Sequence, residues 1–111
     1  MDNIKTDAYY VSKLITDLSF IITHTDGVTK EEFGRDEVLQ DSVMFRMIQI
    51  SENAAKLTDG FREAHPDVPW RAIRGMRNRI VHEYGHVDIS VVYDTVMNDI
   101  PSLLEAVEKT D

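Results

Sequence analysis

The sequence predicts an all-α fold, an antiparallel four-helix bundle with a short extra helical turn. Three observations support this prediction. Apolar residues recur at steps of three and four along four long segments, which is the spacing of one face of an α-helix. Capping residues and glycines stand where these stripes begin and end. The alternating apolar pattern of a β-strand is missing, and 111 residues fit a single domain over positions 1–111.

The first predicted helix carries its apolar stripe over residues 4–22. It ends near Gly27, because a glycine readily adopts the left-handed turn that follows many helices. Residues 29–34 then predict a short helical turn, which begins with a capping box at Thr29.

A second long helix is predicted over residues 36–61, with Asp36 as its N-cap and one apolar stripe along its length. Phe45, Ile48 and Ala55 add a second apolar edge to this helix. A helix that is apolar on more than one side needs two partners, and one of them can be another subunit.

The third predicted helix follows Pro69, since proline suits the first turn of a helix, and its apolar positions extend to Ile80. The fourth carries its stripe over residues 89–107. Pro101 lacks a backbone N–H, so we expect it to kink or interrupt this last helix.

The composition excludes several classes of protein. Hydrophobic residues make up 42% and charged residues 29% of the chain, as in globular domains. Cysteine is absent, which excludes disulfides, cysteine nucleophiles and thiolate metal sites. No apolar run is long enough to cross a membrane, and the first residues do not resemble a signal peptide. The sequence therefore predicts a cytoplasmic protein without a membrane partner.

The charge is unevenly distributed along the chain. The net charge of −8 argues against a protein that coats nucleic acid non-specifically. Residues 62–86, however, hold five arginines and three acidic residues, a net charge of +2, whereas seven basic and seventeen acidic residues elsewhere leave −10. This basic segment is either a local variation of the surface or a phosphate-binding site, for which the arginine guanidinium group is well suited.

The end of the third helix combines three kinds of polar chemistry. Asn78 and His82 are one turn apart and share a face, whereas Arg77 and His82 lie about 140° apart around the axis. A histidine can transfer protons at neutral pH, and an arginine can stabilise charge on a phosphate, so the set suits metal-free cleavage of RNA. A histidine that caps the helix end, beside solvated arginines, fits the same spacing. His82 and His86 could also ligate a metal, but we expect neither a metal nor a cofactor.

The run from Val68 to Tyr84, VPWRAIRGMRNRIVHEY, closely resembles the signature of HepT-like proteins of the HEPN superfamily. These are the toxins of MNT/HepT toxin–antitoxin modules. Their motif, Arg-x4-His-x-Tyr, falls on Arg77, His82 and Tyr84, and Asn78 matches the asparagine that usually follows the arginine. Residues 49–55 and 99–101 extend the resemblance, so that it covers essentially the whole chain.

The resemblance implies a homodimer in which two motif copies face one shared cleft. It implies a type VII-like toxin, a metal-independent endoribonuclease in which Arg77, Asn78 and His82 are catalytic. Its RNA-phosphate contacts would include Arg74 and Arg79. The resemblance further implies that an MNT-type nucleotidyltransferase antitoxin neutralises the toxin by transferring AMP to Tyr84.

One departure and two alternatives accompany this interpretation. Many family members carry Gly-Glu-Ala where this chain has Ser51-Glu52-Asn53, which places the local helix packing in question. The same arginine and histidine would also serve a non-catalytic dimer that binds a nucleotide or a partner and acts as an accessory subunit of a nucleotidyltransferase. The acidic net charge favours this alternative. A purely structural dimer would leave the basic segment unexplained.

Overall fold

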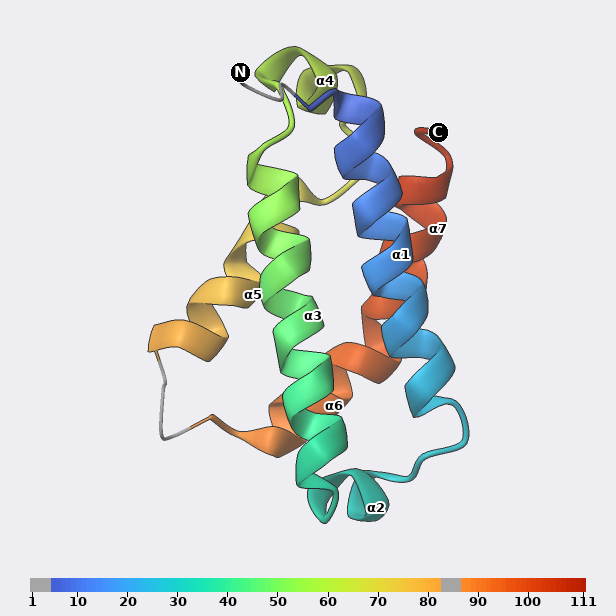
Figure 1. Cartoon of the computed structure of the whole chain (residues 1–111), viewed down its shortest axis with the longest axis vertical. Helices are drawn as coiled ribbons and strands as arrows, with labels where there is room; N and C mark the ends of the chain where they lie inside the picture. The colour runs from blue at the N-terminus through green and yellow to red at the C-terminus, as the bar shows by residue number, and fades with distance from the viewer. Residues whose placement is uncertain (1–4, 83–86) are drawn as a thin grey trace.

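Helices form most of the computed structural model, which describes residues 5–82 and 87–111 (Figure 1). Their bounds are α1 (Asp7–Thr25), α2 (Lys30–Gly34), α3 (Glu37–Ala55), α4 (Asp59–Ala64), α5 (Trp70–His82), α6 (Ile89–Asn98) and α7 (Ile100–Glu108). α1 and α3 pack side by side in opposite directions, α7 packs against α1, and α5 packs against α3 at an angle to the other long helices (Figure 1). The all-α prediction is confirmed.

α1 forms because its apolar stripe faces the other helices. Val11, Leu14, Leu18 and Ile21 are all buried in the core. The helix ends where the sequence predicted, since Gly27 follows it with a φ of 73°, a backbone conformation that residues with a Cβ rarely adopt. The first four residues, where the predicted stripe began, lie outside the described part of the chain.

The short helix α2 begins with the predicted capping box. The Thr29 hydroxyl accepts a hydrogen bond from the Glu32 amide at 3.1 Å, and the Glu32 carboxylate accepts one from the Thr29 amide at 2.9 Å. These hydrogen bonds, with the one to the Thr29 backbone as the largest cause, hold the pKa of Glu32 below its ordinary value of 4.5. Asp36 caps α3 as predicted, since its carboxylate accepts from the Leu39 amide.

The prediction of the second helix is wrong in one respect, because residues 36–61 do not form one continuous helix. α3 ends at Ala55, and Thr58 caps the separate helix α4 by accepting a hydrogen bond from the Phe61 amide at 3.1 Å. The Asp7 carboxylate of α1 fixes this break: it accepts from the Thr58 amide at 2.9 Å and from the Thr58 hydroxyl at 2.8 Å. The apolar stripe continues across the break only because α4 resumes on the same side of the core.

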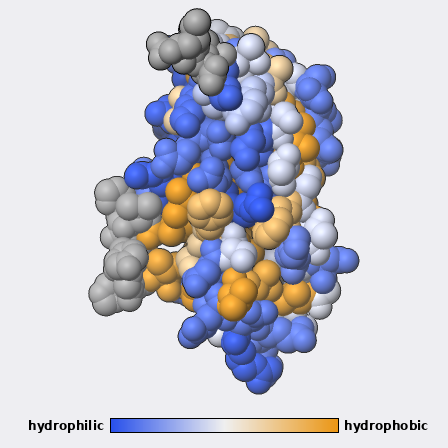
Figure 2. All heavy atoms as spheres, viewed as in Figure 1, coloured by the Kyte–Doolittle hydropathy of each residue, from blue (hydrophilic) through white to orange (hydrophobic). Residues whose placement is uncertain are grey.

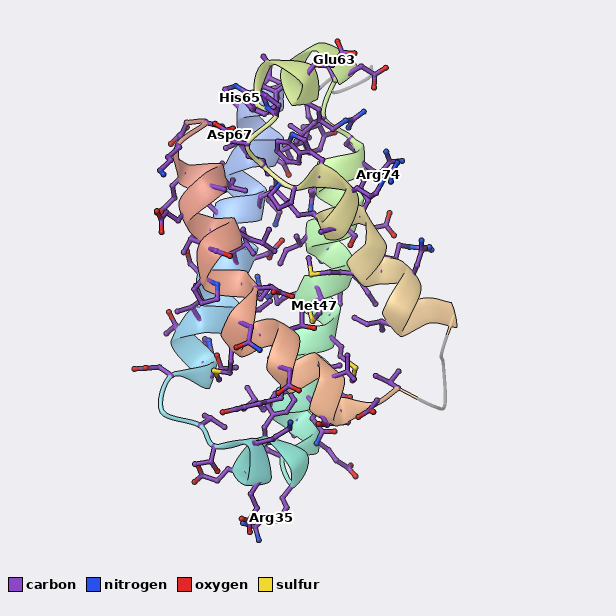
Figure 3. The ribbon with its side chains drawn as sticks, turned by 180° about the vertical axis from the view of Figure 1, so that it is seen from behind. Arg35, Met47, Glu63, His65, Asp67 and Arg74 are labelled. Carbon is purple, nitrogen blue, oxygen red and sulfur yellow. The ribbon has the colours of Figure 1, made fainter. Side chains whose placement is uncertain are left out.

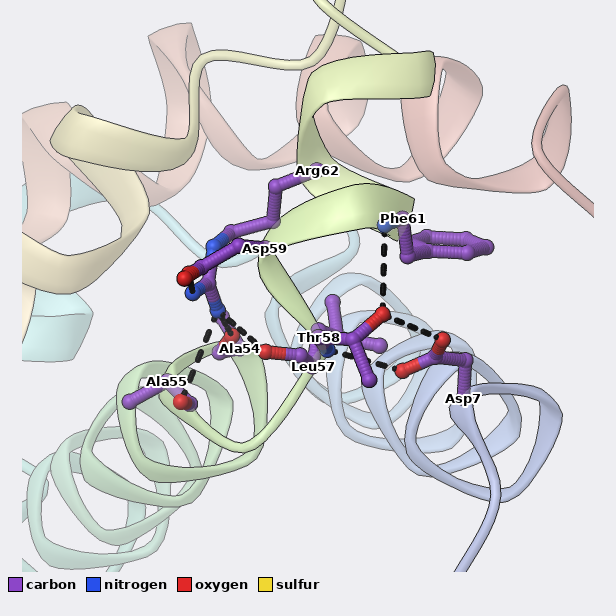
Figure 4. A network of polar contacts seen from close by, with 8 residues as sticks. All are labelled: Asp7, Ala54, Ala55, Leu57, Thr58, Asp59, Phe61 and Arg62. Atoms are coloured by element: carbon purple, nitrogen blue, oxygen red, sulfur yellow. Dashed lines mark hydrogen bonds and ion pairs between the residues drawn. The ribbon is translucent and has the colours of Figure 1, made fainter.

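Arg62 holds the break from the other side (Figure 4). Its guanidinium group donates to the carbonyl oxygens of Ala54 at 2.9 Å and Leu57 at 2.7 Å, and to the Asp59 carboxylate at 2.6 Å. The Arg62 side chain is only 17% exposed. The carbonyl groups at the end of a helix lack partners within the helix, and a cation there also interacts favourably with the helix dipole. One arginine of the basic segment therefore stabilises the fold.

The fourth predicted helix is divided, as Pro101 led us to expect. α6 ends at Asn98, and α7 begins at Ile100 with Pro101 in its first turn. Both parts bury apolar residues, including Val96 and Val107. The four predicted long segments thus correspond to α1, to α3 with α4, to α5, and to α6 with α7.

A buried carboxylate lies between α1 and α3. Asp17 is 1% exposed, and one of its oxygens accepts a hydrogen bond from Arg46 at 2.7 Å. The Arg46 guanidinium group also lies over the Phe20 ring, 3.9 Å from its centroid. Among residues 5–82 and 87–111, no helix combines the length and apolar character required to cross a membrane.

Candidate functional site

Helix α5 separates its apolar and polar residues onto opposite sides. Ile73, Met76 and Ile80 are buried against the core, at steps of three and four residues. Arg74 and Asn78, which occupy the intervening positions, are exposed. Figure 3 shows the Arg74 side chain extending outward from α5. The same apolar spacing that predicted the helix therefore places Arg74 and Asn78 on the surface.

The start of α5 is anchored to the loop that precedes it. The indole N–H of Trp70 donates a hydrogen bond to the His65 carbonyl oxygen at 3.0 Å. The Trp70 ring also packs against the Phe61 ring of α4, with centroids 6.3 Å apart. These contacts fix the direction in which α5 leaves α4, and thereby the positions of Arg74, Arg77 and Asn78.

Ser51 joins α3 to α5 at the first residue of the motif. Its hydroxyl donates to the Ile73 carbonyl oxygen at 2.6 Å and accepts from the Arg77 amide at 3.0 Å. These two backbone groups are the ones that pair across one turn of an α-helix. Ser51 is 3% exposed, so both contacts are protected from water. Ser51, one of the residues at which the sequence departs from the pattern that it resembles, therefore adds a direct connection between the helices at Arg77.

Glu52 holds the side chain of Arg77. The Arg77 Nε donates to the Glu52 carboxylate at 3.1 Å, and the two side chains are 43% and 47% exposed. Ion pairs exposed to this extent contribute about 0–1 kcal/mol, because solvent screens them. Glu52 therefore orients the guanidinium group without binding it so tightly that a phosphate could not replace the carboxylate.

A groove of about 650 Å³ runs between α3, α4 and α5. From α5 it is lined by Trp70, Arg71, Arg74, Gly75, Arg77 and Asn78. Ser51, Glu52 and Ala55 line it from α3, and Arg62 and Glu63 do so from α4. The groove is large enough for a nucleotide-sized ligand. Its arginines provide positive charge and hydrogen-bond donors, which are the groups that recognise phosphate.

The structure brings together three of the predicted site residues. Arg74, Arg77 and Asn78 line one groove. His82 is the last residue of α5, but its side chain lies outside the described residues, as does that of Arg79. Tyr84 also lies outside the described part of the chain.

Sequence reasoning did not predict that Ser51 and Glu52 contact Arg77. Both residues belong to the segment 49–55 that extends the resemblance to HepT-like proteins, and the sequence holds no other signal for them. Within the described ranges, 5–82 and 87–111, no three metal-ligating side chains form a cluster.

Comparison with known proteins identifies the family of the chain. The family model described as "Ribonuclease HepT-like" matches residues 14–110, which include all of α3 and α5. The chain belongs to the HepT-like ribonuclease family. The resemblance seen in the sequence is thereby confirmed at the level of the family.

The HepT-like relatives extend across nearly the whole chain. A candidate RNase of Caldanaerobacter subterraneus is 32% identical over 105 residues, covering 95% of this chain and 94% of the relative. The "probable ribonuclease HepT" of Thermococcus cleftensis is 32% identical over 100 residues, covering 90% and 91%. A Methanocaldococcus jannaschii protein, named as a gamma-glutamylcyclotransferase and candidate RNase, is 30% identical over 100 residues, or 90% of this chain and 45% of that protein. No solved structure gives a significant match.

Proposed function

We propose that this HepT-like protein is a metal-independent endoribonuclease whose reaction is carried out by Arg77, Asn78 and His82. The observation that carries this proposal is the placement of Arg77 and Asn78 in one groove, with Arg77 held by α3 through both its amide and its guanidinium group. Family membership and the position of His82 later on the same helix support it.

The proposed reaction needs one proton acceptor and one proton donor. A base removes the proton of a ribose 2′-hydroxyl, and the 2′-oxygen attacks the adjacent phosphorus. The bond to the 5′-oxygen of the next nucleotide breaks as an acid protonates that oxygen, which leaves a 2′,3′-cyclic phosphate and a 5′-hydroxyl. His82 transfers a proton, Arg77 stabilises the charge on phosphorus-bound oxygens, and Asn78 orients the phosphate. Arg74 and Arg79 bind neighbouring phosphates.

A homodimer would supply both proton-transfer groups. The motif has one histidine per chain, His82, which cannot serve as base and acid in the same step, whereas two chains related by a two-fold axis provide two copies of it. The exposed apolar side chains of α3 and α6 support a subunit interface. Phe45 is 57% and Val91 46% exposed, and Figure 2 shows hydrophobic side chains gathered on this face.

The toxin role and its control follow from the family resemblance. We propose that an MNT-type nucleotidyltransferase neutralises the protein by transferring AMP from ATP to the Tyr84 hydroxyl, with release of pyrophosphate. Tyr84 follows His82 by two residues, so the added phosphodiester would bring a negative charge close to the motif. That charge would compete with the RNA backbone for the arginines.

The catalytic proposal is tested by substitution. His82→Ala and Arg77→Ala should each lower the cleavage rate by about 10²–10⁴-fold, and EDTA should have no effect. Arg35→Ala is the matched control, because Arg35 is an exposed arginine paired with Glu31 on α2, far from Arg74 (Figure 3). Wild-type protein that cleaves no RNA, or a His82 variant that remains fully active, would exclude the proposal.

The dimer and the modification need separate tests. Phe45→Glu and Ile48→Glu should yield monomers in light scattering and lose cleavage together. Full activity as a monomer would exclude the shared site. Tyr84→Phe should retain most of the cleavage activity, gain no AMP in intact-mass measurements after co-expression with the nucleotidyltransferase, and escape neutralisation. An unmodified Tyr84 in a silenced wild-type protein would show that the partner inhibits by binding alone.

The net charge of −8 favours one alternative, an accessory subunit that binds a nucleotide or a partner without cleaving RNA. An acidic protein repels RNA over most of its surface. Purified protein that binds the nucleotidyltransferase but leaves RNA intact would favour this alternative.

A further inference from the structure

We propose that the groove between α3 and α5 binds the single-stranded RNA that flanks the cleaved bond, with Arg74 and Arg71 each contacting a phosphate. The choice of RNA as ligand rests on the proposed ribonuclease function. The groove itself is a feature of the structure, and it extends from Arg77 and Asn78 toward the start of α5.

The arginines that line the groove differ in whether their guanidinium groups already form hydrogen bonds or ion pairs within the protein. The Arg62 guanidinium group already donates hydrogen bonds within the protein, to the carbonyl oxygens of the buried residues Ala54 and Leu57 and to the Asp59 carboxylate. Arg77 is paired with Glu52. Arg71 and Arg74 are exposed, and neither forms an ion pair with any residue in the described ranges. These two arginines are therefore available to bind anionic ligands.

The spacing of these arginines suits a strand rather than a single anion. Arg71, Arg74 and Arg77 are three residues apart, so the first and last are separated by about 9 Å along the helix axis. Successive phosphates of a stacked strand advance by about 3.4 Å, so this span covers between two and three nucleotide steps. A row of guanidinium groups at this spacing can follow a backbone that continues from the phosphate at Arg77.

Gly75 keeps the middle of the groove open. It lies inside α5, where glycine lowers helix stability, and it lines the groove. Its φ is not positive, and a Cβ built there would meet no atom within 4 Å. Neither the backbone conformation nor helix packing therefore requires a glycine. The missing side chain instead lets a ligand approach the helix backbone between Arg74 and Arg77.

Two properties limit the ligand to a short single-stranded segment. A groove of about 650 Å³ accommodates a short single-stranded segment, whereas a duplex is recognised across its broad minor groove, which is a much larger surface. Glu63 lines the groove from α4, beyond Arg74 in the direction of the start of α5 (Figure 3). Its carboxylate repels a further phosphate there, so the strand leaves the groove before α4.

Binding can be measured without cleavage by using a 12-nucleotide 2′-O-methyl RNA, which lacks the attacking hydroxyl. Its affinity for the full chain is followed by fluorescence anisotropy as the salt concentration is varied. Arg74→Ala should weaken binding by about three- to tenfold and reduce the salt slope by about 0.7, the value for one single-strand phosphate contact. Arg71→Ala should act in the same direction, and the remote Arg35→Ala should have no effect.

A steric variant tests the groove without removing charge. Gly75→Phe should fill the groove and weaken binding as much as Arg74→Ala does. It should leave the salt slope unchanged, because it removes no charged group. Gly75→Ala, whose methyl group meets no atom of the protein within 4 Å, should weaken binding of the 12-mer less than Gly75→Phe does. Circular dichroism checks that each variant folds.

Cleavage assays separate this inference from the proposed function. On a long RNA, Arg74→Ala should raise KM and leave kcat unchanged. On a dinucleotide substrate, which has no flanking phosphates, it should cleave as wild-type does.

The proposed binding of RNA in the groove is overturned if wild-type protein cleaves RNA while the Arg71→Ala, Arg74→Ala and Gly75→Phe variants all bind and cleave it normally. Binding that depends on Arg74 without any cleavage would support the groove and refute the ribonuclease. Binding of AMP but not of the 12-mer, or no binding at all, would overturn the groove.

Discussion

Replacing Arg62 tests whether this arginine of the basic segment stabilises the fold or binds RNA. Arg62 donates to the carbonyl oxygens of Ala54 and Leu57, whose residues are 0% and 3% exposed. Hydrogen bonds from a charged donor contribute about 1.5–3 kcal/mol each, and water can replace only part of them at so buried a site. We expect Arg62→Ala to lower the free energy of unfolding by about 2–4 kcal/mol and the melting temperature by roughly 8–20 °C.

Two further variants serve as controls for Arg62→Ala. The Asp59 side chain is 90% exposed, so its ion pair with Arg62 contributes little, and Asp59→Ala should change stability by less than about 1 kcal/mol. Arg62→Lys retains the charge but replaces the planar guanidinium group, so it should recover only part of the stability.

Urea unfolding followed by far-ultraviolet circular dichroism measures these effects. The protein concentration must be held constant, because dimerisation would couple stability to it. An Arg62→Ala variant within about 0.5 kcal/mol of wild-type would refute the assignment of Arg62 to the helix end. A reduced salt slope of RNA binding in the folded Arg62→Lys variant would show instead that Arg62 contacts phosphate.

Three further predictions concern stability and the position of the site. Ser51→Ala should lower the free energy of unfolding by only about 1 kcal/mol, because the backbone groups that Ser51 contacts can pair with each other. It should also raise KM for RNA, because Arg77 loses a contact that positions it, and an unchanged KM would contradict this. Because the pKa of Glu32 is lowered in the folded protein, its capping interaction stabilises the fold above pH 4.5 and is lost as the pH falls through the lowered pKa. Glu32→Gln should therefore lower the melting temperature at pH 7 but not under strongly acidic conditions. Arg46→Ala should cost about 3 kcal/mol in chemical denaturation, because it leaves the buried Asp17 carboxylate without its cation, and Asp17→Asn in the same background should recover stability.

The sequence by itself determined the helical elements whose ends depend on near neighbours. The capping box at Thr29, the N-cap at Asp36 and the glycine after α1 each act within a few residues, so their chemistry can be read directly from the chain. The interruption at Pro101 is equally local, because it follows from a missing backbone donor. The apolar spacing of α5 is also local, and the residues at that spacing, Ile73, Met76 and Ile80, are buried in the core.

Only the tertiary structure decided the features that depend on residues far apart in the sequence. The break after α3 is fixed by Asp7, which is 51 residues from Thr58, and no periodic pattern connects these two positions. Ser51 and Glu52 reach Arg77 across 26 and 25 residues, because the packing of α5 on α3 brings them together. The groove exists only between those packed helices. Local sequence determines where a helix begins and ends, whereas the contacts that build this site form only after the helices have packed.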